Sequence, residues 1–224
     1  MSTVKLVWTT PNGVDLIAYM ARVSNPGNQN NPDSSAKLLK YLVRNKHWSP
    51  FEMVSMCVEI DTTRDIARQI LRHRSFSFQE FSTRYAVAGA SMASEARLQD
   101  TKNRQNSFET DDAELQSAWH REQEEVLARS RQAYDWALGA GIAKEVARRV
   151  LPEGLTASRM YMNGTLRSWI HYVELRCDPA TQKEHREVAD QIKEIMFKEY
   201  PVLAEVLAPH ASVDVTAQGK AAAG

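Results

Sequence analysis

Apolar residues recur at helical spacing along most of this chain. Residues 35–45 show the pattern most clearly, because Leu38, Leu39, Leu42 and Val43 fall on one helical face behind a serine that can cap the helix. The same criteria predict helices over 15–23, from residue 63 onward, and over 111–138, 143–151, 166–176 and 180–197. The sequence therefore predicts a largely helical protein.

Two segments alternate between apolar and polar residues as strands do. Residues 53–60 place valine, methionine and isoleucine on one side and serine, cysteine and glutamate on the other, which predicts a half-buried strand. Residues 160–165 are predicted to form a short second strand. The polar segment 88–110 is too long for an ordinary connection, and we expect it to be a loop that covers substrate.

Length and charge narrow the class of protein. With 224 residues and 25.3 kDa, the chain suits one domain, predicted over 1–210, followed by a tail over 211–224 that has little to pack against. Its 28 basic and 28 acidic side chains balance, so no overall field attracts nucleic acid or an anionic membrane. The first residues lack the apolar run of a signal peptide and no segment suits a membrane span, so we expect a soluble, cytoplasmic protein.

The cysteines and histidines do not suggest a metal site. Cys57 and Cys177 form no CxxC pair, and the six histidines are scattered along the chain. This usage argues against both a disulfide scaffold and a zinc site, so no metal is predicted.

Candidate chemistry concentrates between residues 61 and 85. Basic side chains outnumber acids there: Arg64, Arg68, Arg72, His73, Arg74 and Arg84 against Asp61, Asp65 and Glu80. Guanidinium groups suit phosphate oxygens, and nearby serine and threonine hydroxyls could complete an anion cradle for a nucleotide or a dinucleotide cofactor. An arginine-rich helix end with ordinary surface salt bridges explains the composition equally well.

The order of residues in 72–84 distinguishes these alternatives. The run RHRSFSFQEFSTR closely resembles the signature of flavin-dependent thymidylate synthases, matching six of seven fixed positions, with Gln79 where the family usually has asparagine. Segments similar to that family also occur, in the same order, at 21–24, 47–52, 145–152 and 166–176. Met53, Thr165 and Ala180 depart from common family patterns. The resemblance extends over about residues 15–200.

The resemblance implies an enzyme that converts dUMP to dTMP with FAD, NADPH and 5,10-methylenetetrahydrofolate. It assigns FAD contacts to Ser24, Ser49, Arg72, His73, Arg74, Gln79, Glu80, Thr165, Leu166, Arg167 and His171. It assigns dUMP contacts to Gln69, Ile70, Leu71, Arg72, Glu80, Phe81, Ser82, Thr83, Arg84, Arg148 and Arg176. Arg176 is the expected catalytic residue, because a guanidinium beside uracil favours ionisation of ring nitrogen 3 and so raises electron density at carbon 5.

Architecture and assembly follow from the same resemblance. It implies an α/β fold of the α+β type, with a central sheet flanked by helices, assembled as a homotetramer that shares active sites between subunits. The chain has no GxGxxG loop, so we expect no Rossmann crevice for FAD or NADPH. Neither Cys177 nor Ser82 is expected to be a covalent nucleophile, because reduced flavin can deliver hydride to the nucleotide adduct directly.

Two other classes of protein fit part of the sequence. A non-enzymatic nucleotide- or RNA-binding module would use the arginines of 72–84 with Phe76, Phe78, Phe81 and Tyr85 as stacking surfaces, and its binding would depend steeply on salt. A catalytically silent helical scaffold would retain a decayed signature. Bound flavin in the purified protein would count against both.

Overall fold

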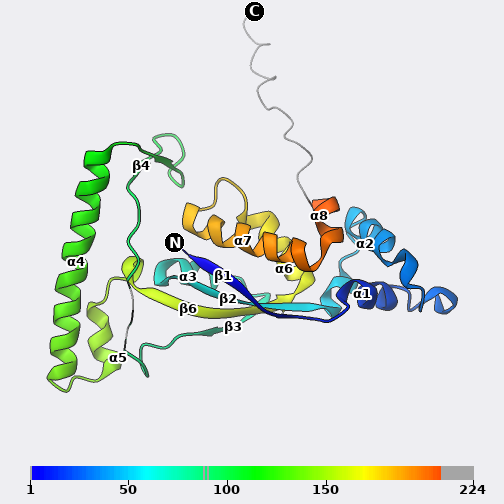
Figure 1. Ribbon diagram of the computed structural model, residues 1–224, viewed down its shortest axis with the longest axis horizontal. Coiled ribbons are helices and arrows are strands. Elements are labelled where there is room, and N and C mark those ends of the chain that lie inside the picture. Colours follow the sequence, from blue (N-terminus) through cyan, green and yellow to red (C-terminus); the bar gives the residue numbers. More distant parts are fainter. Residues whose placement is uncertain (1, 88, 90, 208–224) are drawn as a thin grey trace, which may run out of the picture.

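The computed structural model describes residues 2–87, 89 and 91–207 (Figure 1). The domain limit predicted at residue 210 and the tail predicted over 211–224 lie outside these residues. Among the described residues, no helix is both long enough and apolar enough to cross a bilayer.

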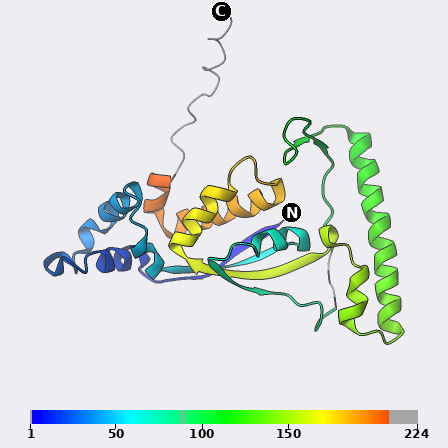
Figure 2. The ribbon, with the colours of Figure 1, turned by 180° about the vertical axis from the view of Figure 1, so that it is seen from behind.

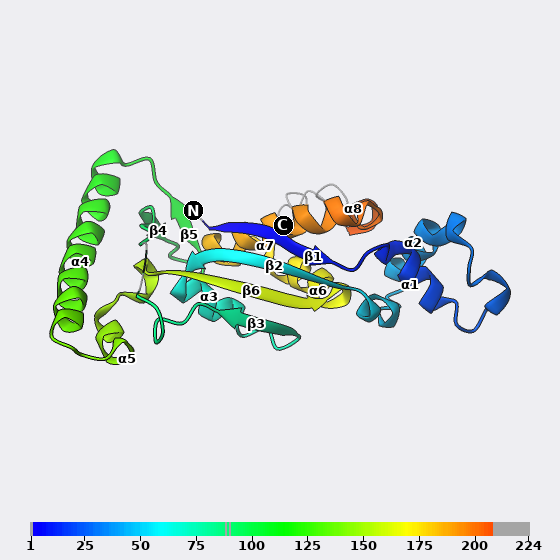
Figure 3. The same ribbon diagram turned by 60° about the horizontal axis from the view of Figure 1, so that its bottom comes forward.

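A four-stranded antiparallel sheet runs through the middle of the molecule, in the order β1-β2-β6-β3 (Figure 3). Its strands are β1 (Thr3–Thr9), β2 (Ser55–Thr63), β6 (Ala157–Thr165) and β3 (Phe76–Glu80). The partner of both β2 and β3 is β6, with Ser55 opposite Thr165 and Phe76 opposite Gly164. Residues far apart in sequence therefore meet at the C-terminal end of β6.

Helices cover one face of this sheet and gather at its two ends (Figures 1 and 2). Over the face lie α3 (Arg64–Ile70), α6 (Leu166–Arg176) and α7 (Lys183–Glu199). One end carries α1 (Gly13–Ala21), α2 (Ser35–Arg44) and α8 (Pro201–Leu207), and the other carries α4 (Ala113–Gly139) and α5 (Lys144–Ala147). Short 3-10 helices occupy Pro26–Asn28, Pro32–Ser34, Ser49–Met53, Arg148–Val150 and Glu153–Leu155.

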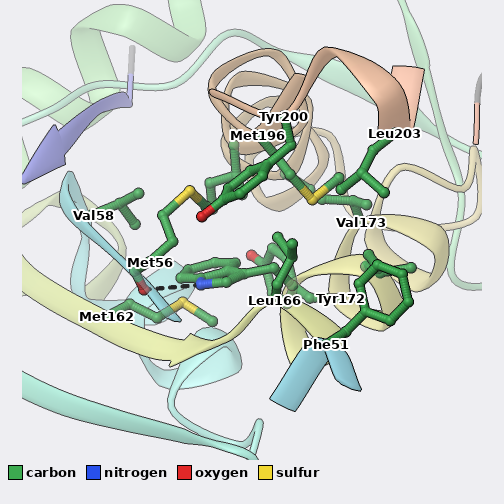
Figure 4. Close-up of a cluster of buried hydrophobic side chains, with 14 of the residues drawn as sticks. Phe51, Met56, Val58, Met162, Leu166, Tyr172, Val173, Met196, Tyr200 and Leu203 are labelled. Carbon is green, nitrogen blue, oxygen red and sulfur yellow. Dashed lines mark hydrogen bonds between the residues drawn. The ribbon is translucent and has the colours of Figure 1, made fainter. Parts of the chain in front are cut away.

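The core lies between the sheet and α6, α7 and α8 (Figure 4). Trp169 is fully buried there and donates its indole N–H to the carbonyl oxygen of Met56 at 2.9 Å, which joins α6 to β2. Gly164 leaves room for the ring of Phe76 on the neighbouring strand, because a Cβ at that position would lie 2.4 Å from the ring. Close packing of this kind fixes the start of β3 against β6.

The predicted elements agree with the structure in kind and differ in extent. Every predicted helix contains helical structure, although the one predicted over 143–151 consists of α5 followed by a 3-10 turn. The strand predicted at 160–165 begins earlier, at Ala157. The prediction of a sheet flanked by helices is confirmed, and the structure adds that the sheet is antiparallel.

Several elements were not predicted. The edge strand β1 and the short helix α8 have no strong local pattern. The signature segment was expected to be a helix end followed by a hydroxyl-rich loop, which is wrong for Phe76–Glu80, because these residues form β3. The segment expected to be a loop at 88–110 contains a small hairpin of β4 (Arg97–Gln99) and β5 (Ser107–Glu109).

Candidate functional site

Arg176, the last residue of α6, is bound to the signature through His73. Its Nε donates to Nε2 of His73 at 2.9 Å. The chain reaches this position because α3 ends at Ile70 and the next residues turn back toward the sheet, where the His73 amide bonds the carbonyl of Ile70. Burial, and then the charge of Arg176, lower the pKa of His73 to about 4, so the ring is neutral at physiological pH and can accept this bond.

A buried aromatic and polar cluster supports this pair. The His73 ring lies 4.9 Å from the ring of Tyr172 and 6.1 Å from that of His185, both in edge contacts. The hydroxyl of Tyr172 is 3.0 Å from Nε2 of His185, and Nδ1 of His185 is 3.4 Å from Oε1 of Gln69. Three elements, α3, α6 and α7, thus meet around the side chain of Arg176.

The first turn of α6 carries a second group of predicted residues. The Thr165 hydroxyl caps the helix by accepting from the Ser168 amide at 3.3 Å, and the Ser168 hydroxyl donates to the Ser75 carbonyl at 3.2 Å. Arg167 forms an ion pair with Glu52, which lies in the 3-10 helix that begins at Ser49. These contacts bring the predicted flavin residues Ser49, Thr165 and Arg167 to the same end of the sheet as Ser75.

His171 completes this end of the molecule. Its ring lies 5.1 Å from the ring of Trp48, and its Nδ1 is 3.8 Å from a carboxylate oxygen of Glu174. The side chain is exposed, as are those of Arg72 and Arg74. These exposed cations and rings can contact a bound dinucleotide without rearrangement of the core.

The third group lies at the opposite end of β3. Glu80 accepts a bond from the Ser158 hydroxyl at 2.7 Å, and the Phe81 amide bonds the Arg159 carbonyl at 2.8 Å. In the turn that follows, Nη1 of Arg148 donates to the hydroxyl of Thr83 at 3.2 Å. Part of the predicted dUMP set is thereby assembled on β3, β6 and the 3-10 turn after α5.

Two further contacts order this turn. Arg84 lies 3.4 Å from a carboxylate oxygen of Glu145, and its backbone amide donates to the hydroxyl of Ser82 at 3.3 Å. The two arginines that could bind a phosphate are therefore each held through one guanidinium nitrogen, Arg148 by Thr83 and Arg84 by Glu145. The carboxylate of Glu145 partly compensates the charge of Arg84.

Some predicted residues contribute no side chain to these groups. Ile70 and Leu166 are fully buried in the core, and Leu71 packs against it, so only their backbones remain for ligand contacts. Gln79 is exposed on β3, and Ser24 is exposed in the turn after α1, at the far end of the molecule.

A cavity of about 770 Å³ lies elsewhere, between α4 and the first turn of α7. Trp119 and Gln123 line it from α4, Arg97 from β4, and Glu184 from α7. None of the predicted site residues lines this cavity.

Several supporting residues were missed in the sequence. Tyr172, His185 and Ser158 touch predicted site residues directly. In the sequence, a tyrosine and a histidine on amphipathic helices resemble ordinary core residues. Only their tertiary contacts show that Tyr172 and His185 support the site. The carboxylates Glu52 and Glu145 lie inside segments that resemble the family, and that placement was the available signal.

Comparison with known proteins is consistent with this geometry. A family model described as thymidylate synthase complementing protein matches residues 5–202. The chain is 54% identical over 198 residues to a flavin-dependent thymidylate synthase of Synechocystis sp., covering 88% of this chain and 90% of the relative. It is 53% identical to a probable flavin-dependent thymidylate synthase of Paramecium bursaria Chlorella virus 1, covering 86% and 89%.

A solved structure shares the fold. It is the UMP/dUMP methylase PolB from Streptomyces cacaoi, bound with 5-Br dUMP. The TM-score is 0.81 at 29% sequence identity, and the match covers 93% of this chain and 95% of the other.

Proposed function

The chain belongs to the thymidylate synthase complementing protein family, and we propose that it converts dUMP to dTMP with 5,10-methylenetetrahydrofolate as carbon donor and NADPH as reductant through FAD. The observation that carries the proposal is the bond from Arg176 to His73, because it joins the signature to the residue expected to activate uracil. A solved structure with the same fold binds a dUMP analogue, which agrees with a nucleotide substrate.

The chain offers residues suited to FAD. Arg72 and Arg74 are exposed beside His73, and Arg167 is half-exposed at the start of α6, so three guanidinium groups are available to a pyrophosphate or to flavin carbonyl oxygens. We propose that these residues hold FAD together with Ser49, Thr165 and His171. When bound, FAD would supply the hydride chemistry that no side chain can perform.

Arg176 is suited to orient and activate the uracil ring. Because its Nε proton is donated to His73, only its two Nη groups remain to face a ligand. A guanidinium directed at the ring stabilises the negative charge that develops on loss of the proton from nitrogen 3, and this raises electron density at carbon 5. Arg84 and Arg148, with Ser82, are suited to hold the dUMP phosphate at the other end of β3.

We further propose a homotetramer in which active sites are shared between subunits. The proposed flavin residues near Thr165 and the proposed phosphate residues near Thr83 lie at opposite ends of β3, about five strand residues apart. The helix α4 stands away from the sheet (Figures 1 and 2). Trp119 and Trp136 on this helix are exposed. A second chain packed there would cover these rings and bring one chain's phosphate residues to another chain's flavin residues.

Purified protein tests the proposed function directly. It should be yellow, oxidise NADPH in the presence of dUMP and methylene-folate, and form dTMP. The Arg74→Ala variant should lose bound flavin, whereas Arg68→Ala, which breaks only an exposed ion pair with Glu153, should retain it. A colourless protein that forms no dTMP when FAD is added would overturn the proposal. Light scattering that gives a monomeric mass for active enzyme would overturn the tetramer.

A further inference from the structure

We propose that His185 is a positioning residue that holds the side-chain amide of Gln69 in one of its two orientations for contact with the uracil ring. The inference rests on the proposed function, because it takes Gln69 as part of the dUMP site. His185 lies in the first turn of α7, is fully buried, and stands between Tyr172 of α6 and Gln69 of α3.

A series of hydrogen bonds that starts at Glu184 and passes through Gln182 determines the orientation of the Gln69 amide. Glu184 is held by Arg97 at 2.5 Å and accepts from Nε2 of Gln182 at 3.0 Å. Burial raises the pKa of Glu184, but bonds from its own amide and from Gln182, together with the charge of Arg97, outweigh burial and leave the pKa below its usual value. The carboxylate of Glu184 therefore only accepts hydrogen bonds, and Gln182 must direct the NH2 group of its side-chain amide toward it.

The same reasoning extends from Gln182 to Gln69 and to the buried His185. Because the amide NH2 group of Gln182 faces Glu184, its Oε1 faces Gln69. Nε2 of Gln69 donates to this oxygen at 2.7 Å. Oε1 of Gln69 then faces Nδ1 of His185, which must carry the proton. Nε2 of His185 is left as an acceptor for the Tyr172 hydroxyl.

This directed chain has a consequence for ligand binding. Nε2 of Gln69 has two protons, and Gln182 takes one of them, so one remains to donate to a carbonyl oxygen of uracil. Rotation of the amide by 180° would present Oε1 instead, which repels an oxygen that gains negative charge when the ring ionises. His185 opposes that rotation, because the amide NH2 group would then take the place of Oε1 and two donors, this NH2 and the Nδ1–H of His185, would face each other.

His185 suits this task because it does not titrate in the physiological range. Burial lowers its pKa to about 3, and the charge of Arg176 adds to the effect. Its ring is neutral, with one donor and one acceptor that match Gln69 and Tyr172. A buried histidine that served packing alone would not need both bonds in this order.

Two variants of nearly equal size separate the two bonds of His185. In His185→Asn, the amide nitrogen can take the place of Nδ1 and keep the donor to Gln69, while the bond to Tyr172 is lost. In His185→Gln, the amide oxygen can take the place of Nε2 and keep the acceptor for Tyr172, while the donor to Gln69 is lost. Each variant loses one buried hydrogen bond, so the two should lose similar thermal stability.

The readouts are the dUMP KM, kcat, dUMP affinity by calorimetry and flavin content, with the Tm as the control for folding. His185→Gln should raise the KM and Kd for dUMP by about tenfold, the value of one well-formed hydrogen bond, with flavin content unchanged. His185→Asn should stay within about threefold of the parent. Equal effects of both variants on dUMP affinity, or none from either, would reject the positioning role.

A spectroscopic measurement tests the inference without any variant. Nitrogen-15 histidine spectra of the intact protein should show neutral rings protonated at Nδ1 for both His73 and His185. The signal that disappears in His185→Asn belongs to His185, and Tyr172→Phe should weaken its tautomer preference. A His185 ring protonated at Nε2 would overturn the inference. Failure of the parent protein to form dTMP would reject the proposed function alone, because the tautomer and the dUMP affinity are measured without turnover.

Discussion

Arg176 and His73 form a directed pair in which the guanidinium Nε donates to the neutral imidazole at 2.9 Å. The pair joins the end of α6 to the signature segment, 103 residues earlier in the chain. Because His73 accepts the Nε–H, this bond orients the guanidinium plane and leaves the N–H groups of the two Nη atoms for other partners.

Replacement of Arg176 by lysine should therefore impair chemistry more than binding. Lysine keeps the positive charge, but it cannot bond His73 and present two further donors in one plane. We expect kcat for dTMP formation to fall by about 100-fold, the usual cost of a lost charge-stabilising donor, with flavin content retained. Single-turnover kinetics with saturating dUMP measure this loss, and a kcat close to that of the parent would show that Arg176 does not activate the ring.

Acid should destabilise the protein through its two buried histidines. Burial is the main cause that lowers the pKa of His73 to about 4 and that of His185 to about 3, from an ordinary value of 6.5. Above pH 6.5 the folded and unfolded chains hold the same number of protons on these rings. As the pH falls from 6.5 toward 4, these two histidines become protonated in the unfolded chain while they stay largely neutral in the folded chain. The free energy of unfolding therefore decreases.

Denaturant titrations at fixed protein concentration between pH 7.5 and pH 4.5 measure that decrease. His185→Asn removes one of the two groups and should give a shallower fall over this range. An identical pH profile for the variant and the parent would mean that His185 takes up its proton in the fold as readily as in the unfolded chain.

The sequence predicted the helices better than it predicted the sheet. Helical periodicity is a local signal, so α2, α4 and α6 were found within a few residues of their ends. By contrast, β1 and β3 pair with strands that lie dozens of residues away, and β1 is shifted in register between Leu6 and Trp8. Such pairing depends on tertiary contacts that a short local pattern does not contain.

The same distinction applies to the site. The arginines and histidine of 72–84 were predicted because they stand in one run. The bond that Arg176 donates to His73 was not predicted, because it joins residues 103 positions apart in the chain. Tyr172 and His185 belong to apolar helix faces and gave no signal of their own. Their contribution follows from the meeting of α3, α6 and α7, which the sequence does not specify locally.

Arg148 and Arg149 offer a matched pair for testing the phosphate site. Arg148 is half-buried and bonds Thr83, whereas Arg149, the next residue, is exposed. Arg148→Ala should raise the KM for dUMP at least about tenfold through loss of a charge-assisted hydrogen bond, with no loss of flavin. Arg149→Ala should leave the KM near that of the parent. Equal effects of the two substitutions would point to a general role of charge at this end of the molecule.

Gly164 should tolerate no side chain. Alanine there would place its Cβ 2.4 Å from the ring of Phe76, and the ring must move to accept it. We expect a loss of about 1–3 kcal/mol in the free energy of unfolding. Gly139→Ala is the control, because its Cβ would meet nothing within 4 Å at the end of α4, and it should be neutral or stabilising. Chemical denaturation of both variants decides the point, and an unchanged Gly164→Ala protein would contradict the packing seen here.

Cys177 and Ser82 are the two side chains whose positions suggest a covalent mechanism. Cys177 follows Arg176 at the end of α6, but its side chain packs against the core, and burial together with a hydrogen bond to Asp190 raises the pKa of the thiol to about 12. Almost no thiolate is then present near neutral pH, and a thiol is a poor nucleophile.

Ser82 lacks a base that could activate it. Its hydroxyl accepts from the amide of Arg84, whose side chain cannot take up a proton at neutral pH, and the nearby carboxylate of Glu80 is bonded by Ser158 at 2.7 Å. Cys177→Ala should therefore keep most activity, and Ser82→Ala should weaken dUMP binding while turnover stays measurable. Mass spectrometry of enzyme quenched during turnover tests both, because a dUMP adduct on either residue that vanished together with activity on substitution would replace activation by Arg176 with covalent catalysis.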